Sequence, residues 1–175
     1  MNFTDYKCLE SLLIDGNKIA MESRADFQKV DPKEGSTIQI KFLNKPFTVK
    51  VAYGSSYEKD GWTLGNINIL KKQAAAINKI IPMINDLSLK HKSDIIKAIQ
   101  QDAKEYYGKE LPDDLNVFDY FVPKVIYAPN QYNKKNDRII AIMDPRYKFD
   151  DEHGAGIEFT NEKYTNGPIQ SDYFY

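Results

Sequence analysis

The sequence predicts an α+β fold in which N-terminal and C-terminal strands form an antiparallel sheet and a central helical pair packs on one face. Three observations predict this arrangement. Apolar and polar residues alternate over residues 36–53, apolar residues recur at helical spacing over 66–107, and β-branched or aromatic runs return over 122–173. Strands followed by helices and then by strands favour α+β over an alternating parallel fold.

A chain of 175 residues is expected to form a single domain over 1–175. This length buries roughly 70% of the unfolded surface, so no disulfide or metal is needed for folding. Residues 1–35 are interpreted as a strand hairpin and a loop. The hairpin-turn signal is "DGNK" at 15–18, and the loop signal is "DPKEG" at 31–35, because proline and glycine resist regular pairing.

The region 36–53 contains the clearest hairpin. Apolar residues share one face on each arm: Ile38, Ile40 and Phe42 on the first, then Phe47, Val49, Val51 and Tyr53 on the second. Asn44 and Lys45 join the two arms. This period of two predicts strands with one face on a core and the other in water. The stretch "GSSYEKDG" that follows is interpreted as a loop.

An apolar stripe at helical spacing predicts a first helix over about 66–86, formed by Ile67, Leu70, Ala74, Ile77, Ile81 and Ile84. Pro82 lies inside this stripe and lacks a backbone N–H, so a kink or a stop and restart is expected there. A second helix over about 93–107 begins with Ser93 as its N-cap and ends at Gly108. His91 is interpreted as a solvated residue before this helix.

The last third of the chain predicts three short strands, in "PKVIYA", "RIIAIM" and "AGIEFT". The segment from Phe118 onward contains 12 of the 22 aromatic residues. Much of the bulk of the core is therefore expected in this part of the chain.

Charge and cysteine content exclude several classes of protein. The net charge is −1, and the lysines and acidic residues are interspersed, so nucleic acid is not an expected partner. Cys8 is the only cysteine, which suits a reducing compartment. The start "MNFTDYK" has no secretory-leader pattern, and the longest aliphatic run, 139–143, is far shorter than the ~20 residues needed to cross a bilayer. We expect a cytoplasmic protein without a membrane partner.

The strongest candidate for chemistry is the stretch "DDEHGAGIEF" at 150–159. Asp150 or Glu152 could orient the ring of His153 for acid–base work, so these three are the candidate catalytic residues. No serine elbow or activated cysteine supplies a nucleophile. The two histidines and one cysteine are scattered along the chain, too few for a closed zinc site. We therefore expect no metal and no cofactor.

The same stretch has a structural interpretation, which the physics favours. Asp150, Glu152 and His153 would form a hydrogen-bonded turn, and Gly154 would supply a positive φ before a strand over 155–160. A glycine pair without a third glycine and a following helix is not a phosphate-binding loop. The structural motif comprises Phe149, Asp150, Glu152, His153, Gly154 and Gly156.

The run "FDDEHGAGIEF", followed by "GPIQSD", resembles an uncharacterised bacterial domain family. Its members end in a W-D-x-E-H-G-x-G-[IV]-x-F stretch and a G-x-Q-D-type ending, and the similarity of order covers about 36–173. Phe149 stands where tryptophan is usual, and two extra residues lie inside the ending that Gln170 and Asp172 would match. The family has no established activity. Some relatives resemble immunity or accessory proteins of bacterial toxin systems, so the resemblance implies a protein partner.

Two functions therefore remain. The first is a non-catalytic binding domain that meets another protein through an exposed strand edge or an acidic, aromatic face, since tyrosines favour interfaces. The alternative is a hydrolase-like or metal-dependent enzyme centred on Asp150, Glu152 and His153. The sequence identifies neither the partner nor the oligomeric state.

Overall fold

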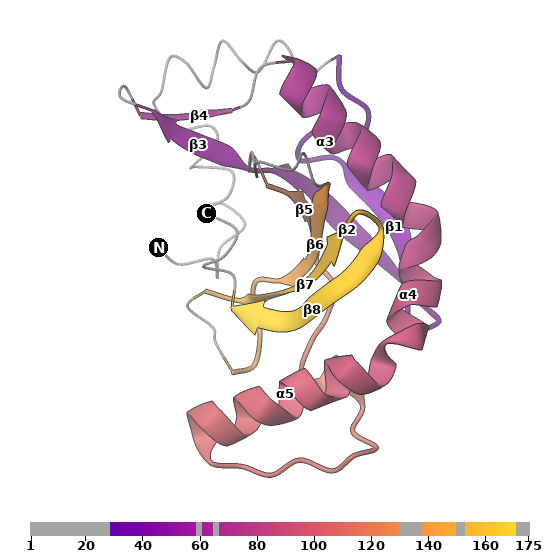
Figure 1. Ribbon diagram of the computed structural model, residues 1–175, viewed down its shortest axis with the longest axis vertical. Coiled ribbons are helices and arrows are strands. Elements are labelled where there is room, and N and C mark those ends of the chain that lie inside the picture. The colour runs from indigo at the N-terminus through magenta and orange to yellow at the C-terminus, as the bar shows by residue number, and fades with distance from the viewer. Residues whose placement is uncertain (1–28, 59–60, 65–66, 130–137, 150–152, 171–175) are drawn as a thin grey trace.

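The fold is α+β, and its sheet has six strands in the order β1-β2-β5-β6-β7-β8 (Figure 1). The computed structural model describes residues 29–58, 61–64, 67–129, 138–149 and 153–170. The strands are β1 Thr37–Phe42, β2 Lys45–Tyr53, β5 Val125–Ala128, β6 Ile139–Asp144, β7 Ala155–Thr160 and β8 Lys163–Gln170. The hairpin predicted within residues 1–35, with its turn at 15–18, lies outside the described residues.

β1 and β2 form the hairpin that the period of two predicts, with Ile40 opposite Phe47. The exposed and buried positions alternate as expected, since Ile40 and Phe42 are buried and Ile38 is partly buried, while Gln39 and Lys41 are exposed. Leu43 and Asn44, rather than the predicted Asn44 and Lys45, make the turn, with φ of 47° and 65°. Two positive φ values are typical of the two-residue turn whose twist matches that of the strands.

One strand pair corrects the prediction of an antiparallel sheet, because β2 and β5 pair in parallel. All other neighbours in the sheet are antiparallel. A parallel pair needs a long crossover, and the helical segment between β2 and β5 provides one. The same connection holds a two-stranded hairpin, β3 Ser55–Glu58 with β4 Gly61–Leu64, where the sequence was interpreted as a loop. That interpretation is wrong.

The helices are α3 Ile67–Ile80, α4 Ile84–Lys90 and α5 Lys92–Tyr107. Pro82 lies in a 3-10 turn, Ile81–Met83, between α3 and α4, which confirms the predicted interruption. The predicted helical pair is not confirmed. α3 and α4 follow one another in an arc along the sheet, and α5 turns away across its lower end (Figure 1). No helix among the described ranges is long and apolar enough to cross a membrane.

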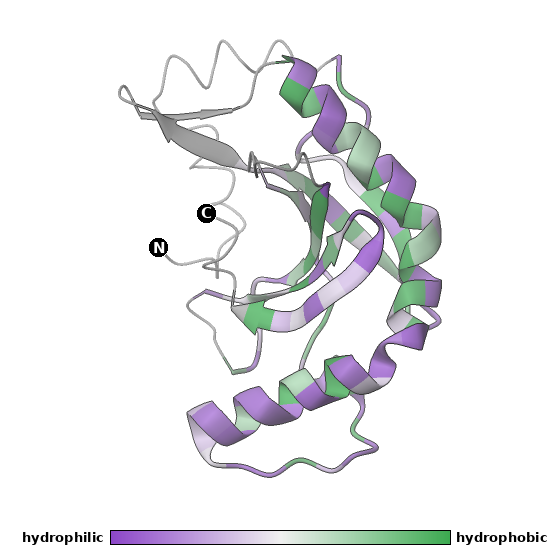
Figure 2. Cartoon of the chain, viewed as in Figure 1, coloured by the Kyte–Doolittle hydropathy of each residue, from purple (hydrophilic) through white to green (hydrophobic). Residues whose placement is uncertain are grey.

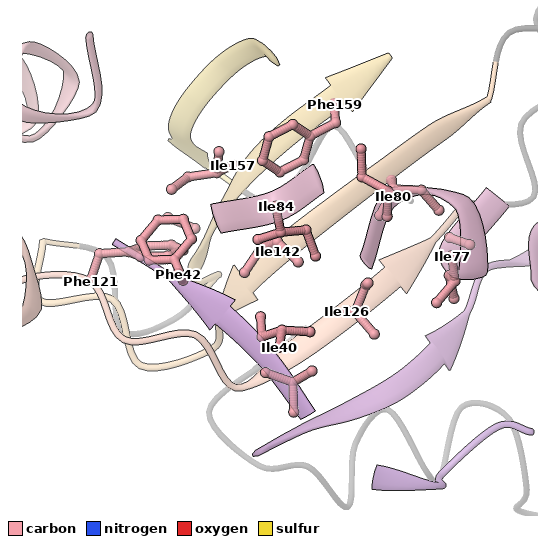
Figure 3. Packing of buried hydrophobic residues seen from close by; sticks show 14 of the residues in the cluster. Ile40, Phe42, Ile77, Ile80, Ile84, Phe121, Ile126, Ile142, Ile157 and Phe159 are labelled. Atoms are coloured by element: carbon pink, nitrogen blue, oxygen red, sulfur yellow. The ribbon is translucent and has the colours of Figure 1, made fainter. Parts of the chain in front are cut away.

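The main core lies between the helices and one face of the sheet (Figure 3). The helices contribute Leu70, Ala74, Ile77, Ile80, Ile84, Ile95, Ile99 and Ala103, and the sheet contributes Ile40, Phe42, Val49, Val51, Ile126, Ile142, Ile157 and Phe159. Figure 2 shows the apolar positions of the helices alternating with hydrophilic ones, as an amphipathic helix requires. Fully burying one such side chain contributes about 1.5–3 kcal/mol.

The opposite face of the sheet is apolar as well. Val125 and Tyr127 of β5 and Ala141 and Met143 of β6 form a second buried cluster. Both faces of β5 and β6 are therefore covered, which explains their almost continuous apolar sequences.

The start of α5 differs from the prediction. The helix begins at Lys92, and His91 rather than Ser93 stands at its N-cap position. The ring of His91 stacks on Tyr164 of β8 at 4.5 Å, so His91 is half-buried instead of solvated. Gly108 ends the helix with φ 61°, as predicted.

Candidate functional site

The predicted motif follows β6 and leads into β7. Asp150 and Glu152 lie outside the described residues. Gly154 has φ +71°, which confirms the predicted backbone conformation. A Cβ added to Gly154 would lie 2.8 Å from both the carbonyl oxygen of Asp144 and Cα of Pro145, so only glycine fits this approach. His153 is half-buried beside it.

Phe149 is the centre of an aromatic cluster. Its ring centroid lies 5.5 Å from the rings of Tyr107, Tyr120 and Tyr147. Phe149 is only 7% exposed, and the Tyr147 ring stands almost perpendicular to it at 82°. Aromatic pairs in this distance range stabilise one another beyond their burial alone. Phe149 is thus a packing centre for three tyrosines.

Tyr147 links this cluster to α5. Its hydroxyl donates a hydrogen bond of 2.7 Å to Oδ2 of Asp102. Burial raises the pKa of Tyr147, and the nearby Asp102 carboxylate raises it further. The phenol therefore remains a protonated donor at neutral pH, and the loop after β6 is tied to the middle of α5.

Asp144 fixes the other end of the same loop. Its carboxylate accepts hydrogen bonds from the backbone N–H of Val122, at 2.7 Å, and of Arg146, at 3.0 Å. Asp144 is only 4% exposed, and this burial raises its pKa, although both hydrogen bonds act in the opposite direction. The residue joins the loop before β5 to the loop after β6.

The outer surface of this cluster is formed by Tyr106, Tyr107, Tyr120 and Lys148, which we call the tyrosine face. Tyr106 is 49% exposed and Tyr107 is 53% exposed, at the end of α5. The Nζ of Lys148 lies 4.5 Å from the ring centroid of Tyr120, within range of a cation–π interaction. Tyr107 and Tyr120 thus pack on the buried ring of Phe149.

In the part of the chain that the structure describes, no group of three or more histidine, cysteine, aspartate or glutamate side chains is arranged to hold a metal ion. Sequence reasoning missed the support of the face, because Tyr147 and Asp102 are 45 positions apart. Two features of the sequence could have indicated the tyrosine face. They are the tyrosine pair at the end of the helix and the high aromatic content of the last third of the chain.

No protein-family model, curated protein or solved structure matches this chain. The resemblance of the stretch around Phe149 stays a prediction.

Proposed function

We propose that this chain is a non-catalytic protein-binding domain and that the tyrosine face contacts its partner. The observation that carries the proposal is that Tyr106 and Tyr107 are about half exposed while Tyr107 packs on Phe149. The bacterial, cytoplasmic setting and the immunity-like or accessory role that the resemblance implies are part of the proposal.

The physical reason is that tyrosine brings a large contact area with few rotatable bonds. Binding is weakened by every side chain that must become ordered in the complex, at about 0.5–1.5 kcal/mol each. The contacts of Phe149 with Tyr107 and Tyr120 restrict these rings before the partner arrives. Tyrosine is also among the residues enriched at the positions that dominate binding energy.

Affinity capture from the native host tests the proposal. The bait is the wild-type chain, and the test variant is Tyr106→Ala/Tyr107→Ala. The matched control is Met83→Ala/Leu89→Ala, which removes the other two exposed large apolar side chains of the described residues. We expect a stoichiometric protein partner with the wild type and the control and its loss with the tyrosine variant. A partner retained by the tyrosine variant would exclude this face.

A further inference from the structure

The segment Val30–Ser36 directly precedes β1. It lies against the edge of β2 beyond the N-terminal end of β1. Gly35 donates its backbone N–H to the carbonyl of Val51, and Val51 donates its own N–H to the carbonyl of Ser36, both at 2.8 Å. Val30 is buried in the main core. The segment therefore extends the sheet past β1, although it is a loop by sequence.

Tyr53, the last residue of β2, holds this segment at two further points. Its hydroxyl donates a hydrogen bond to the carbonyl of Pro32. Its backbone N–H donates to the carboxyl group of Glu34. On the other side, Nδ2 of Asn78 in α3 donates to the carbonyl of Asp31 at 3.0 Å. The carboxyl group of Glu34 thus accepts the Tyr53 N–H in the way that a backbone carbonyl of a neighbouring strand would.

The second oxygen of Glu34 is buried without a partner. Its Oε2 is shielded from solvent and accepts no hydrogen bond. Burial raises the pKa of Glu34 well above its ordinary value, and the hydrogen bond from Tyr53 only partly offsets this. Among the described residues, the titratable groups that interact with Glu34 are Tyr53 of β2 and Tyr127 of β5, and Asp31 of its own segment lies near Tyr53. These groups are acids, and none of them offers Glu34 a counter-charge.

We propose that Glu34 is a proton-linked latch, which holds the segment Val30–Ser36 on the edge of β2 as the neutral acid and releases the segment when it ionises. A neutral carboxyl group accepts the Tyr53 N–H through one oxygen and carries no charge, so its burial costs far less than that of a carboxylate. A carboxylate with an unpartnered oxygen in the same place is strongly disfavoured. Release would expose the edge N–H groups of Val51 and Tyr53, which another strand could bind.

The direction of the pH dependence follows from the raised pKa. Below the ordinary pKa of about 4.5, Glu34 is protonated in the native and the released states alike, and the latch is closed. Above that value the released state loses its proton while the latched state keeps it. The equilibrium constant for release then rises by up to about tenfold for each pH unit, until the pKa of the latched state is passed.

Amide hydrogen exchange of the wild-type protein between pH 5 and pH 8 tests the latch. We expect the protection factors of the Val51 and Tyr53 amides to fall with rising pH, while that of Ile142 in the sheet centre stays constant. In Glu34→Gln, whose amide oxygen can still accept from Tyr53, protection at Val51 and Tyr53 should not depend on pH. Glu105→Gln, at an exposed position on α5, should behave like the wild type.

Two results would overturn the proposal. One is constant protection at Val51 and Tyr53 across the pH range in the wild type, a measurement that needs no variant to fold. The other concerns the protection of the Val51 and Tyr53 amides that is lost at pH 8. If potassium added at fixed ionic strength restores this protection in the wild type but not in Glu34→Gln, Glu34 is an ion ligand and not a latch.

Discussion

The hydroxyl of Tyr147 donates a 2.7 Å hydrogen bond to Asp102, and this bond joins the loop after β6 to α5. The loop carries Phe149, on which Tyr107 and Tyr120 pack. One phenol–carboxylate contact therefore stabilises the support of the tyrosine face.

Tyr147→Phe is expected to destabilise the fold by about 1.5–3 kcal/mol, the typical value of a hydrogen bond to a charged group. The phenyl ring keeps the packing on Phe149, so the change in the free energy of unfolding reports the loss of the hydroxyl group alone. Tyr107→Phe is the matched control, because Tyr107 is half exposed, and its stability should change by less than about 0.5 kcal/mol. Urea denaturation measures both. Equal effects for the two variants would contradict the role of the Tyr147–Asp102 bond.

Gly154→Ala should destabilise more than Gly108→Ala. Both glycines have positive φ, which costs an alanine about 1 kcal/mol. A Cβ at Gly154 would also lie 2.8 Å from the backbone around Asp144, whereas a Cβ at Gly108 meets nothing within 4 Å. The difference between the melting temperatures of the two variants therefore measures the destabilisation caused by the close contact at residue 154. Indistinguishable melting temperatures would show that the close contact at Gly154 adds no cost to that of the positive φ.

Ile99→Asp is expected to unfold the protein. Ile99 is fully buried in the main core, where an unpaired carboxylate costs several kcal/mol. Lys97→Asp places the same side chain on the exposed side of α5 and should leave a cooperative melting curve. Circular dichroism during heating distinguishes the two. A folded, cooperatively melting Ile99→Asp variant would contradict the packing of α5 on the sheet.

Glu162 should make stability depend on pH in the acidic range. Arg138 bonds its two carboxylate oxygens at 2.7 and 2.9 Å, and Lys79 lies 3.1 Å away. The hydrogen bonds from Arg138 are the largest cause of a pKa lowered to about 2. This stabilisation is full above the unfolded pKa, near 4.5, and is lost as the pH falls towards 2.

Glu162→Gln should therefore be less stable than the wild type at pH 6 and equal to it near pH 2. Glu110→Gln is the control, because its contact with Lys104 is 3.8 Å long and exposed. Denaturant titrations at the two pH values give the comparison. A Glu162→Gln deficit that persists unchanged at pH 2 would show that the ion pair is not its cause.

The elements with strong local patterns were predictable. Alternation alone defines β1 and β2, since each strand must bury one face. Pro82 predicts the break between α3 and α4 because its missing N–H cannot continue the helix. Gly154 predicts a positive φ for a similarly local reason.

Features that depend on distant partners were not predictable. The parallel pairing of β2 with β5 depends on the path of the long connection between them, which periodicity does not encode. β8 was not assigned as a separate strand, because Gly167 and Pro168 are typical of turns. Gly167 is required there, since its added Cβ would lie 2.6 Å from the carbonyl oxygen of Gly156. The tyrosine face likewise depends on contacts between α5 and a loop far along the chain.

The most direct test of a binding role is the affinity of the captured partner for three forms of the protein, measured by titration calorimetry. The forms are wild type, Tyr106→Ala/Tyr107→Ala and Met83→Ala/Leu89→Ala, each with its melting temperature checked. We predict that the tyrosine variant loses at least 2 kcal/mol of binding free energy, about thirtyfold in Kd, as expected for residues that dominate an interface. The control should bind as the wild type does. Equal affinity of all three forms, or a loss confined to the control, would contradict binding through the tyrosine face.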